Sequence, residues 1–220
     1  MRVLTYNVRS LRDDVDALAR VVHRVEPDVV AVQEAPRFLR WRSKRAALAR
    51  RCGLVVGTAD RTGGLFLMTS LRAEVLGSSY TLLPKAPRLH HRAVVTVDIR
   101  LAGACWTVAS VHFSLDAEQR RSHLPAIRAA LDTPHPLVVA GDINEDPDGP
   151  VFAELAGDFQ DCFAVAGSGQ GLTGPANAPR RRIDAVFASR TVTVERCEVL
   201  NGPDVERASD HRPLLAVLSQ

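Results

Sequence analysis

The chain has 220 residues, of which 46% are hydrophobic, and its 28 basic and 25 acidic residues give a formal net charge of +3. A sheet-rich chain of this length can form one undivided core, so we expect a single domain over residues 1–220. No apolar stretch is long enough to cross a bilayer and no signal-peptide pattern is present, so we expect a cytoplasmic protein without a membrane segment.

Hydrophobic periodicity predicts alternating strands and helices in the first half of the chain. A strand is expected over residues 3–8, followed by an amphipathic helix that Asp13 or Asp14 caps and Pro27 ends. A buried strand over residues 28–33 leads into a basic helix from Phe38 to Arg51. Closely spaced runs typical of an antiparallel meander follow, at 64–69, 73–82, 92–100 and 104–112.

The second half continues in the same alternating manner. We expect a helix near residues 116–131, a strand over Pro136–Ala140, a short helix near Pro150–Leu155 and strands at 182–188, 192–200 and 213–218. The Gly- and Pro-rich stretch 167–179 is interpreted as a long loop. This mixture over one continuous length predicts two packed sheets with helices outside them.

The four cysteines have no metal-site or disulfide spacing. They contain no CxxC pair and lie in or beside apolar stretches, at Cys52, Cys105, Cys162 and Cys197. We therefore expect buried thiols rather than a zinc site or a disulfide framework.

Short polar signatures occur where the predicted strands end. They are Thr5-Tyr6-Asn7, Gln33-Glu34, Val111-His112-Phe113, Gly141-Asp142-Ile143-Asn144, Arg182-Ile183-Asp184 and Ser209-Asp210-His211. A fold that aligned these strand ends would gather carboxylates, amides and two imidazoles in one pocket. A pocket of that composition suits metal-assisted attack on a phosphate ester.

Each signature also has a simpler interpretation when it is taken alone. Glu34 could favour the dipole of the basic helix, Asp142 could be an ordinary turn residue, and His112 could be a core histidine with a satisfied hydrogen bond. The acids around Asp142 are similar to a calcium loop, but they lack its spacing and its closing glutamate. The joint order of the signatures favours the functional interpretation.

This ordered series, together with Thr173, resembles the motifs of the endonuclease/exonuclease/phosphatase superfamily, and the resemblance extends from residue 5 to residue 214. It implies a four-layered α/β/β/α sandwich, in which two mixed and mainly antiparallel sheets pack face to face. It also implies an active site at one sheet edge and a magnesium-dependent phosphoesterase activity.

Roles for the individual residues follow from this resemblance and from the needs of phosphate ester hydrolysis. Glu34 is expected to bind Mg²⁺ directly, with Asn7 and Asp210 completing the ligand set and Mn²⁺ able to substitute. The expected catalytic residues are the base Asp142, Asn144 to turn the carboxylate or the phosphate, His112 and His211 to donate to the non-bridging oxygens, and Asp184 to orient His211.

Two groups of basic residues could contact substrate. Arg180-Arg181-Arg182 precedes Asp184, and a second group lies on the basic helix at Arg37, Arg40, Arg42, Lys44, Arg45, Arg50 and Arg51. Most of the helix group is interpreted as a solvated face opposite apolar Leu39, Ala46, Ala47 and Leu48. Arg37 and Arg181 are the residues that we expect to bind substrate.

Departures from subfamily patterns narrow the function. Abasic endonucleases that are similar to exonuclease III carry a tryptophan where this chain has Arg181, and an Asn or Asp where it has Arg9. An abasic-site repair role is therefore not expected. His23, His123 and His135 are interpreted as surface or loop residues, and His90-His91 as exposed strand polarity.

Three functions remain open. The arginines near the site favour a nuclease acting on DNA or RNA. The small size and modest charge favour a phosphatase or phosphodiesterase on a small phosphorylated metabolite or a lipid headgroup. A non-catalytic relative is disfavoured, because the polar set is intact.

Overall fold

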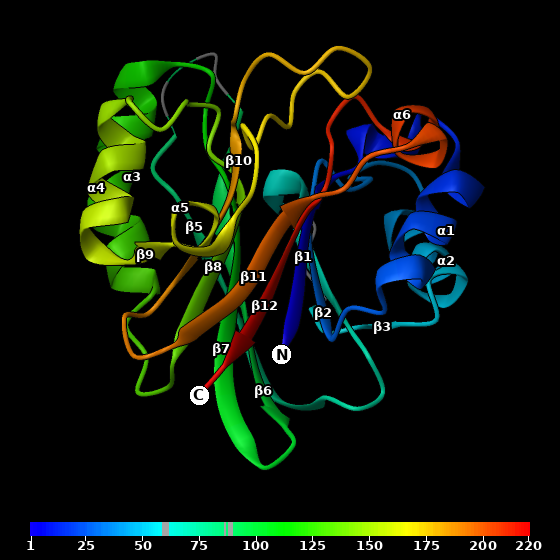
Figure 1. The fold of residues 1–220 in the computed structure, drawn as a ribbon, viewed down its shortest axis with the longest axis horizontal. Coiled ribbons are helices and arrows are strands. Elements are labelled where there is room, and N and C mark those ends of the chain that lie inside the picture. Colours follow the sequence, from blue (N-terminus) through cyan, green and yellow to red (C-terminus); the bar gives the residue numbers. More distant parts are fainter. Residues whose placement is uncertain (59–61, 86, 88–89) are drawn as a thin grey trace.

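The structure is a computed structural model that describes residues 1–58, 62–85, 87 and 90–220. Two mixed six-stranded sheets pack face to face between outer helices, which confirms the predicted α/β/β/α sandwich (Figure 1). No helix in the described part of the chain has the length and apolar character needed to span a membrane.

The first sheet has the strand order β11-β12-β1-β2-β4-β3. Only β1 and β2 run parallel, and the other neighbours in this sheet are antiparallel. The strands are β1 (Arg2–Asn7), β2 (Val29–Gln33), β3 (Val55–Val56), β4 (Phe66–Thr69), β11 (Thr193–Val199) and β12 (Leu214–Ser219).

The second sheet has the order β5-β6-β7-β8-β10-β9, and it likewise contains one parallel pair, β7 with β8. The antiparallel meander β5-β6-β7 confirms the prediction for the runs at 73–82, 92–100 and 104–112, whereas the run at 64–69 forms β4 and pairs with β2 in the first sheet. The strands are β5 (Glu74–Leu82), β6 (Ala93–Leu101), β7 (Ala104–His112), β8 (Leu137–Asp142), β9 (Gln160–Asp161) and β10 (Asp184–Ala188).

Helices cover the outer face of each sheet. Figure 1 shows α1 (Val15–Val25), α2 (Trp41–Arg51) and α6 (Pro203–Ala208) on one side, with α3 (Ala117–Ala130) and α4 (Pro150–Asp158) on the other. The short α5 (Cys162–Ala166) packs against β10 and β11, and two 3₁₀ turns complete the set, at Arg9–Leu11 and Thr62–Gly64. Asp14 caps α1, as one of the two predicted candidates, because its Oδ1 accepts from Asp16 N at 3.0 Å and Ala17 N at 2.9 Å.

Alternating side chains build three apolar layers. In β1, Val3 packs between the two sheets, whereas Leu4 and Tyr6 pack under the first group of helices. This is the two-residue period of a strand that is covered on both faces. A third cluster, which includes Val139 and Phe187, lies under α3 and α4.

The pairing register brings the polar strand ends to one edge. Asn7 pairs with Gln33 across β1 and β2, and Asp142 pairs with both His112 on β7 and Asp184 on β10. Gly141 permits this arrangement, since any Cβ there would lie 2.0 Å from the carbonyl oxygen of Val111. The predicted alignment of strand ends is therefore present.

Several local expectations were wrong. Helix α2 begins at Trp41 rather than Phe38, and Leu39 is 82% exposed instead of packing on the sheet. Arg45 takes the buried position, where its side-chain nitrogens donate to Pro36 O at 3.2 Å and Leu65 O at 3.0 Å. His123 is fully buried rather than a surface residue, with Nε2 2.8 Å from Pro84 O.

Candidate active site

Asp142 is the centre of the polar edge. It ends β8, is buried, and its Oδ1 accepts from the backbone N–H of Asn144 at 2.9 Å. Its Oδ2 accepts from Asn7 Nδ2 at 3.0 Å and lies 3.4 Å from His112 Nε2 and 3.9 Å from His211 Nε2. One carboxylate oxygen thus faces an amide and two imidazoles from three other segments of the chain.

His211 is held by Asp184, as the resemblance implied. Its Nδ1 lies 2.8 Å from Asp184 Oδ2. Thr173 connects the two segments, because its Oγ1 accepts from Ile183 N at 3.2 Å and Asp184 N at 3.1 Å, while its carbonyl accepts from Arg212 N at 2.7 Å. The buried Thr173 thereby fixes the start of β10 relative to the His211 loop.

The buried groups have displaced pKa values. Burial and the nearby Asp184 carboxylate raise the pKa of Asp142 to about 7. Burial by itself would lower the pKa of His211, but the carboxylates of Asp184, Asp142 and Asp210 raise it to about 10. Burial, together with the charges of Arg92, His211 and Arg37, lowers the pKa of His112 well below its ordinary range. At neutral pH, His211 is therefore a cation and His112 is neutral.

Two of the three predicted metal ligands lie together. Asn7 Nδ2 is 3.4 Å from Glu34 Oε1, and Glu34 follows β2 with a left-handed φ of 51°. The third predicted ligand, Asp210, does not contact either of them among the described hydrogen bonds, although the preceding residue Ser209 donates from Oγ to Asn7 O at 2.6 Å. The carboxylate of Asp210 is 3.3 Å from Arg9 Nε. Arg9, which stands where abasic endonucleases carry an Asn or Asp, therefore pairs with the third predicted metal ligand.

The donor set fits a hard divalent cation. The carboxylates of Glu34, Asp142 and Asp184 and the amide of Asn7 supply oxygen atoms, and Asp184 Oδ1 is buried without a hydrogen-bond partner among the described residues. Ligand atoms of Asp142, Asp184 and His211 also lie within 4.8 Å of one another. Because a protonated His211 has no lone pair to offer, we interpret this trio as an imidazolium between two carboxylates.

A cavity of about 290 Å³ opens beside these groups. Glu34 and His112 line it on the side of the reaction centre. The other lining residues are Ser10, Arg12, Arg37, Gly63, Gly64, His90, Arg92 and Leu115. Arg37, which we expected to bind substrate, therefore lies where a ligand of the site would be.

Arg181 lies elsewhere. It is half-exposed, its Nε is 2.8 Å from Asp146 Oδ2, and it does not line the cavity. Its neighbour Arg182 is buried, where it pairs with Asp161 and stacks on the Phe163 ring at 4.7 Å. The Arg180–Arg182 segment thus has two of its three charges paired within the protein.

Other residues contribute in ways that the sequence analysis missed or assigned differently. Arg92 was not considered, yet it lines the cavity. The side-chain amide of Asn144 donates to Phe113 O at 2.9 Å, so its backbone N–H, not its amide, orients Asp142. Glu145 caps α4, with Oε2 accepting from Val151 N at 2.6 Å and Phe152 N at 2.9 Å, which removes it from any calcium loop.

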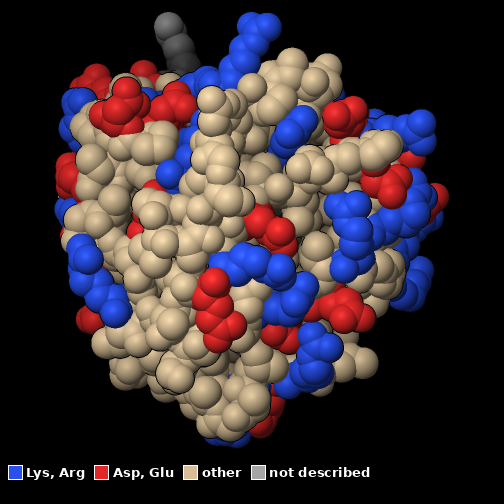
Figure 2. All heavy atoms as spheres, viewed as in Figure 1, with Lys and Arg blue, Asp and Glu red and all other residues tan. Residues whose placement is uncertain are grey.

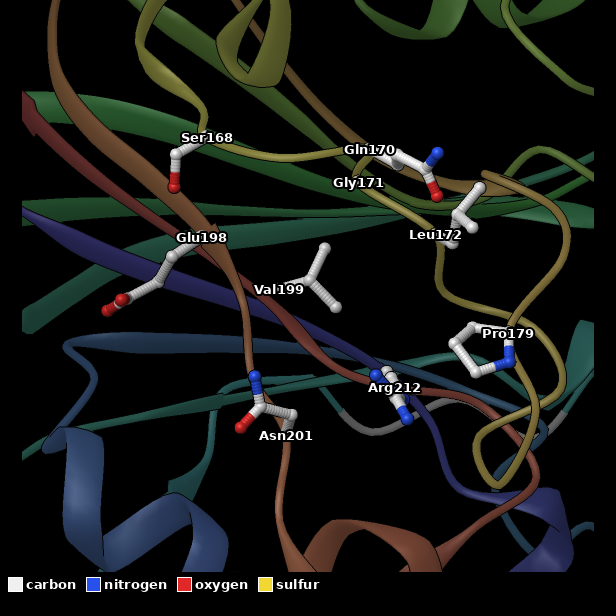
Figure 3. Close-up of a pocket in the computed structure, with 9 residues that line it drawn as sticks. All are labelled: Ser168, Gln170, Gly171, Leu172, Pro179, Glu198, Val199, Asn201 and Arg212. Carbon is white, nitrogen blue, oxygen red and sulfur yellow. The ribbon is translucent and has the colours of Figure 1, made fainter.

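A second hollow of about 400 Å³ lies between β11 and the 167–179 loop. Figure 3 shows its lining residues, among them Ser168, Glu198, Asn201 and Arg212. Although Arg212 follows His211, its Nε donates to Ala176 O at 2.7 Å, and no group assigned to the reaction lines this hollow. The cavity beside His112 is therefore the candidate site.

Solved structures share this fold over the full chain. A mannosyl-6-phosphatase from Bacteroides thetaiotaomicron has a TM-score of 0.86 at 15% identity, covering 100% of both chains. A Bacteroides vulgatus endonuclease/exonuclease/phosphatase scores 0.82 at 21% identity, covering 99% of this chain and 98% of that one. The human Nocturnin catalytic domain with bound sulfate scores 0.77 at 17% identity, covering 100% and 94%.

No curated protein matches the chain by sequence at a significant level. The structural neighbours, all below 25% identity, establish the fold alone. The family model of the Endonuclease/Exonuclease/phosphatase family matches residues 4–211, which includes every residue of the polar edge. The chain therefore belongs to this family of divalent-metal-dependent phosphoric ester hydrolases.

Proposed function

We propose that the protein is a Mg²⁺-dependent phosphoesterase in which Asp142 is the general base. The observation that carries this proposal is the convergence of Asn7, His112 and His211 on Asp142 Oδ2. A buried carboxylate with a pKa raised to about 7 is well matched to accept a proton near neutral pH.

The side chains divide the work of hydrolysis. Asp142 takes the proton of the attacking water, while Asn7 and the Asn144 N–H keep its two oxygens in place. The cationic His211 donates from Nε2 to a non-bridging phosphate oxygen, because its Nδ1 is engaged by Asp184. Neutral His112, whose Nε2 also lies beside Asp142 Oδ2, donates a second hydrogen bond to the phosphate. These preset donors stabilise the charge that develops in the transition state.

Glu34 and Asn7 are the proposed Mg²⁺ ligands, and Mn²⁺ should substitute because the donors are oxygens. Asp210 would join them once its contact with Arg9 loosens, and the exposure of its side chain, 44%, allows such movement. When bound, the cation would neutralise the phosphate and polarise its ester bond.

We further infer that a small phosphorylated molecule is the preferred substrate. Among the described residues, the arginines that line the cavity form no ion pair with a carboxylate, whereas Arg181 and Arg182 are paired within the protein. A cavity of about 290 Å³ is near the lower size limit of ligand pockets, which suits a compact ligand. The fold neighbour that is a mannosyl-6-phosphatase supports the same class.

A nuclease acting on DNA or RNA is the second candidate. Its support is α2, where Arg42, Lys44 and Arg50 are exposed and the helix carries no acid. On the face drawn in Figure 2, however, basic and acidic side chains are interspersed rather than gathered into one track. Arg181 could contact a phosphate outside the cavity if it left Asp146.

A substrate panel tests the proposal. With Mg²⁺ present, we expect turnover of sugar phosphates, inositol phosphates or bis-p-nitrophenyl phosphate that salt weakens only mildly. Stronger turnover of supercoiled plasmid or single strands, with steep loss as salt rises, would establish the nuclease instead. Failure of the whole panel with Mg²⁺ and with Mn²⁺ would contradict the phosphoesterase proposal.

A further inference from the structure

Three arginines beside the reaction centre lack protein partners. Arg12, Arg37 and Arg92 line the same cavity as Glu34 and His112. Within the described part of the chain, their side chains form no ion pair and donate no hydrogen bond, and Arg92 Nε is fully buried without an acceptor. The guanidinium of Arg37 lies over the Phe38 ring, 5.9 Å from its centroid. The cavity therefore holds more positive charge than its one carboxylate, Glu34, can balance.

This arrangement differs from the way the protein treats its other arginines near the site. Arg120, which is buried, pairs with Glu145 at 3.0 Å, and the half-exposed Arg181 pairs with Asp146 at 2.8 Å. A guanidinium removed from water without a partner is costly, and burial lowers the pKa of Arg92. A fold that leaves Arg92 unpaired beside a cavity is arranged for an anion supplied from outside.

The scissile phosphate does not need these charges. In the proposed function it is served by the cation at Glu34 and Asn7, by the His211 cation and by His112. The three arginines exceed that requirement, and guanidinium groups match phosphate oxygens with two parallel hydrogen bonds each.

The cavity wall is shaped to leave room between the arginines. Gly64 has a φ of +69°, and a Cβ there would lie 3.3 Å from Arg37 Cδ. Gly63 has a φ of +75°, and a Cβ there would lie 2.9 Å from the Cβ of Ala93, the residue after Arg92. Two consecutive left-handed glycines thus line the cavity together with Arg37 and Arg92, and a side chain at Gly64 would crowd Arg37.

We propose that this cavity is a subsite for a second phosphate group, so that the preferred substrates are small molecules carrying two phosphates, one cleaved at Asp142 and one held by Arg12, Arg37 and Arg92. The inference rests on the proposed phosphoesterase function. It adds the chemical class of the substrate and the residues that select it.

Paired substrates provide the test. KM and kcat are measured with Mg²⁺ on glucose 1,6-bisphosphate and on glucose 1-phosphate, for the wild type and for Arg92→Gln and Arg37→Gln. Arg100→Gln is the matched control, because Arg100 lies at the opposite end of β6 from Arg92 and pairs with Glu74 at 2.8 Å. Melting temperatures identify any variant that fails to fold. If Arg92→Gln does not fold, Arg37→Gln still tests the subsite, because Arg37 lies on a loop outside the regular elements.

We expect the wild type to favour the bisphosphate in kcat/KM by about tenfold or more, and each cavity variant to lose that preference mainly through KM. The Arg100 variant should retain it. Metal-free calorimetry with inorganic phosphate should show binding to the wild type and the control, with loss in both cavity variants.

The outcomes separate the two proposals. Equal kinetics on both sugars in all variants, with phosphate binding unchanged, would overturn the subsite while leaving the phosphoesterase intact. Loss of phosphate binding in the cavity variants, in a protein that hydrolyses no ester, would support the anion subsite and reject the phosphoesterase.

Discussion

The two halves of the site differ in how their charges are satisfied. In the reaction half, defined by Asp142, Asp184 and His211, each charged group is buried against another, and the His211–Asp184 distance is 2.8 Å. In the cavity half, which contains Glu34, Arg37 and Arg92, the arginines have no partner within the described residues. One half is complete within the protein, and the other is completed by what binds there.

This difference assigns different kinds of work to the two halves. Groups that hold one another at fixed distances need no reorganisation when charge develops, which is the requirement for transition-state stabilisation. Groups that wait for a ligand gain their partners on binding. Substitutions in the reaction half should therefore lower kcat, and substitutions in the cavity half should raise KM.

Removal of the divalent cation should lower the rate of hydrolysis more than any other change, because both halves of the site lose its positive charge. We expect excess EDTA to abolish hydrolysis and added Mg²⁺ or Mn²⁺ to restore it. Glu34→Gln should require a higher Mg²⁺ concentration for half-maximal rate, while its melting temperature without metal stays near that of the wild type. Full turnover in excess chelator would refute the metal assignment.

Within the reaction half, Asp142→Asn and His211→Ala should each lower kcat by about 10²–10⁴-fold. The double variant should lose much less than the product of the two factors, since both groups act on one transition state. Melting temperatures should change little, because both residues lie at the polar edge rather than in the apolar layers. A folded single variant with near wild-type kcat would show that its assigned role is wrong.

The pH dependence of kcat/KM should report the ionisation of Asp142 and His211. Activity needs ionised Asp142, so kcat/KM should rise as pH increases through about 7, and a bound cation would move this limb to lower pH. Activity also needs protonated His211, so kcat/KM should fall as pH increases through about 10. Asp184→Asn removes the carboxylate that holds the His211 proton, and should move the alkaline limb down toward the ordinary histidine pKa. NMR titration of His211 in the metal-free protein checks the shift directly, and an unmoved value would contradict this pairing.

The reaction half could be predicted from sequence because strand ends fix it. Asn7, His112, Asp142 and Asp184 all end or begin a buried strand, and pairing in register then places them at one edge. The same logic explains the successful prediction of both sheets, whose strands are long enough to show a pattern. The strands β3 and β9 were missed because two residues are too few to show an alternation, and α5 and α6 were missed because five or six residues make less than two helical turns.

The cavity half was harder to predict because its residues have no such anchor. Arg92 follows His90-His91 and directly precedes β6. Nothing in the sequence there distinguishes an arginine that lines a cavity from one that is exposed to solvent. The prediction for Arg45 was wrong in the opposite direction. Its basic neighbours in the sequence suggested an exposed side chain, but Arg45 is buried and donates to the backbone carbonyls of Pro36 and Leu65. Long cationic side chains are placed by tertiary partners that lie far away in sequence.

The smallest effect is expected for Arg181, which lies outside both halves. Its guanidinium pairs with Asp146 at half exposure, and such pairs contribute about 1 kcal/mol or less. A guanidinium also cannot enclose an apolar baseless sugar as an indole does. Arg181→Ala should therefore raise KM modestly, with a smaller loss in kcat, and only for substrates with phosphates beyond the cavity.

At matched salt, abasic and intact duplexes should be nicked at similar rates, if at all. A preference for the abasic duplex of about tenfold or more would restore a repair role and move the substrate contacts from the cavity arginines to the Arg181 segment.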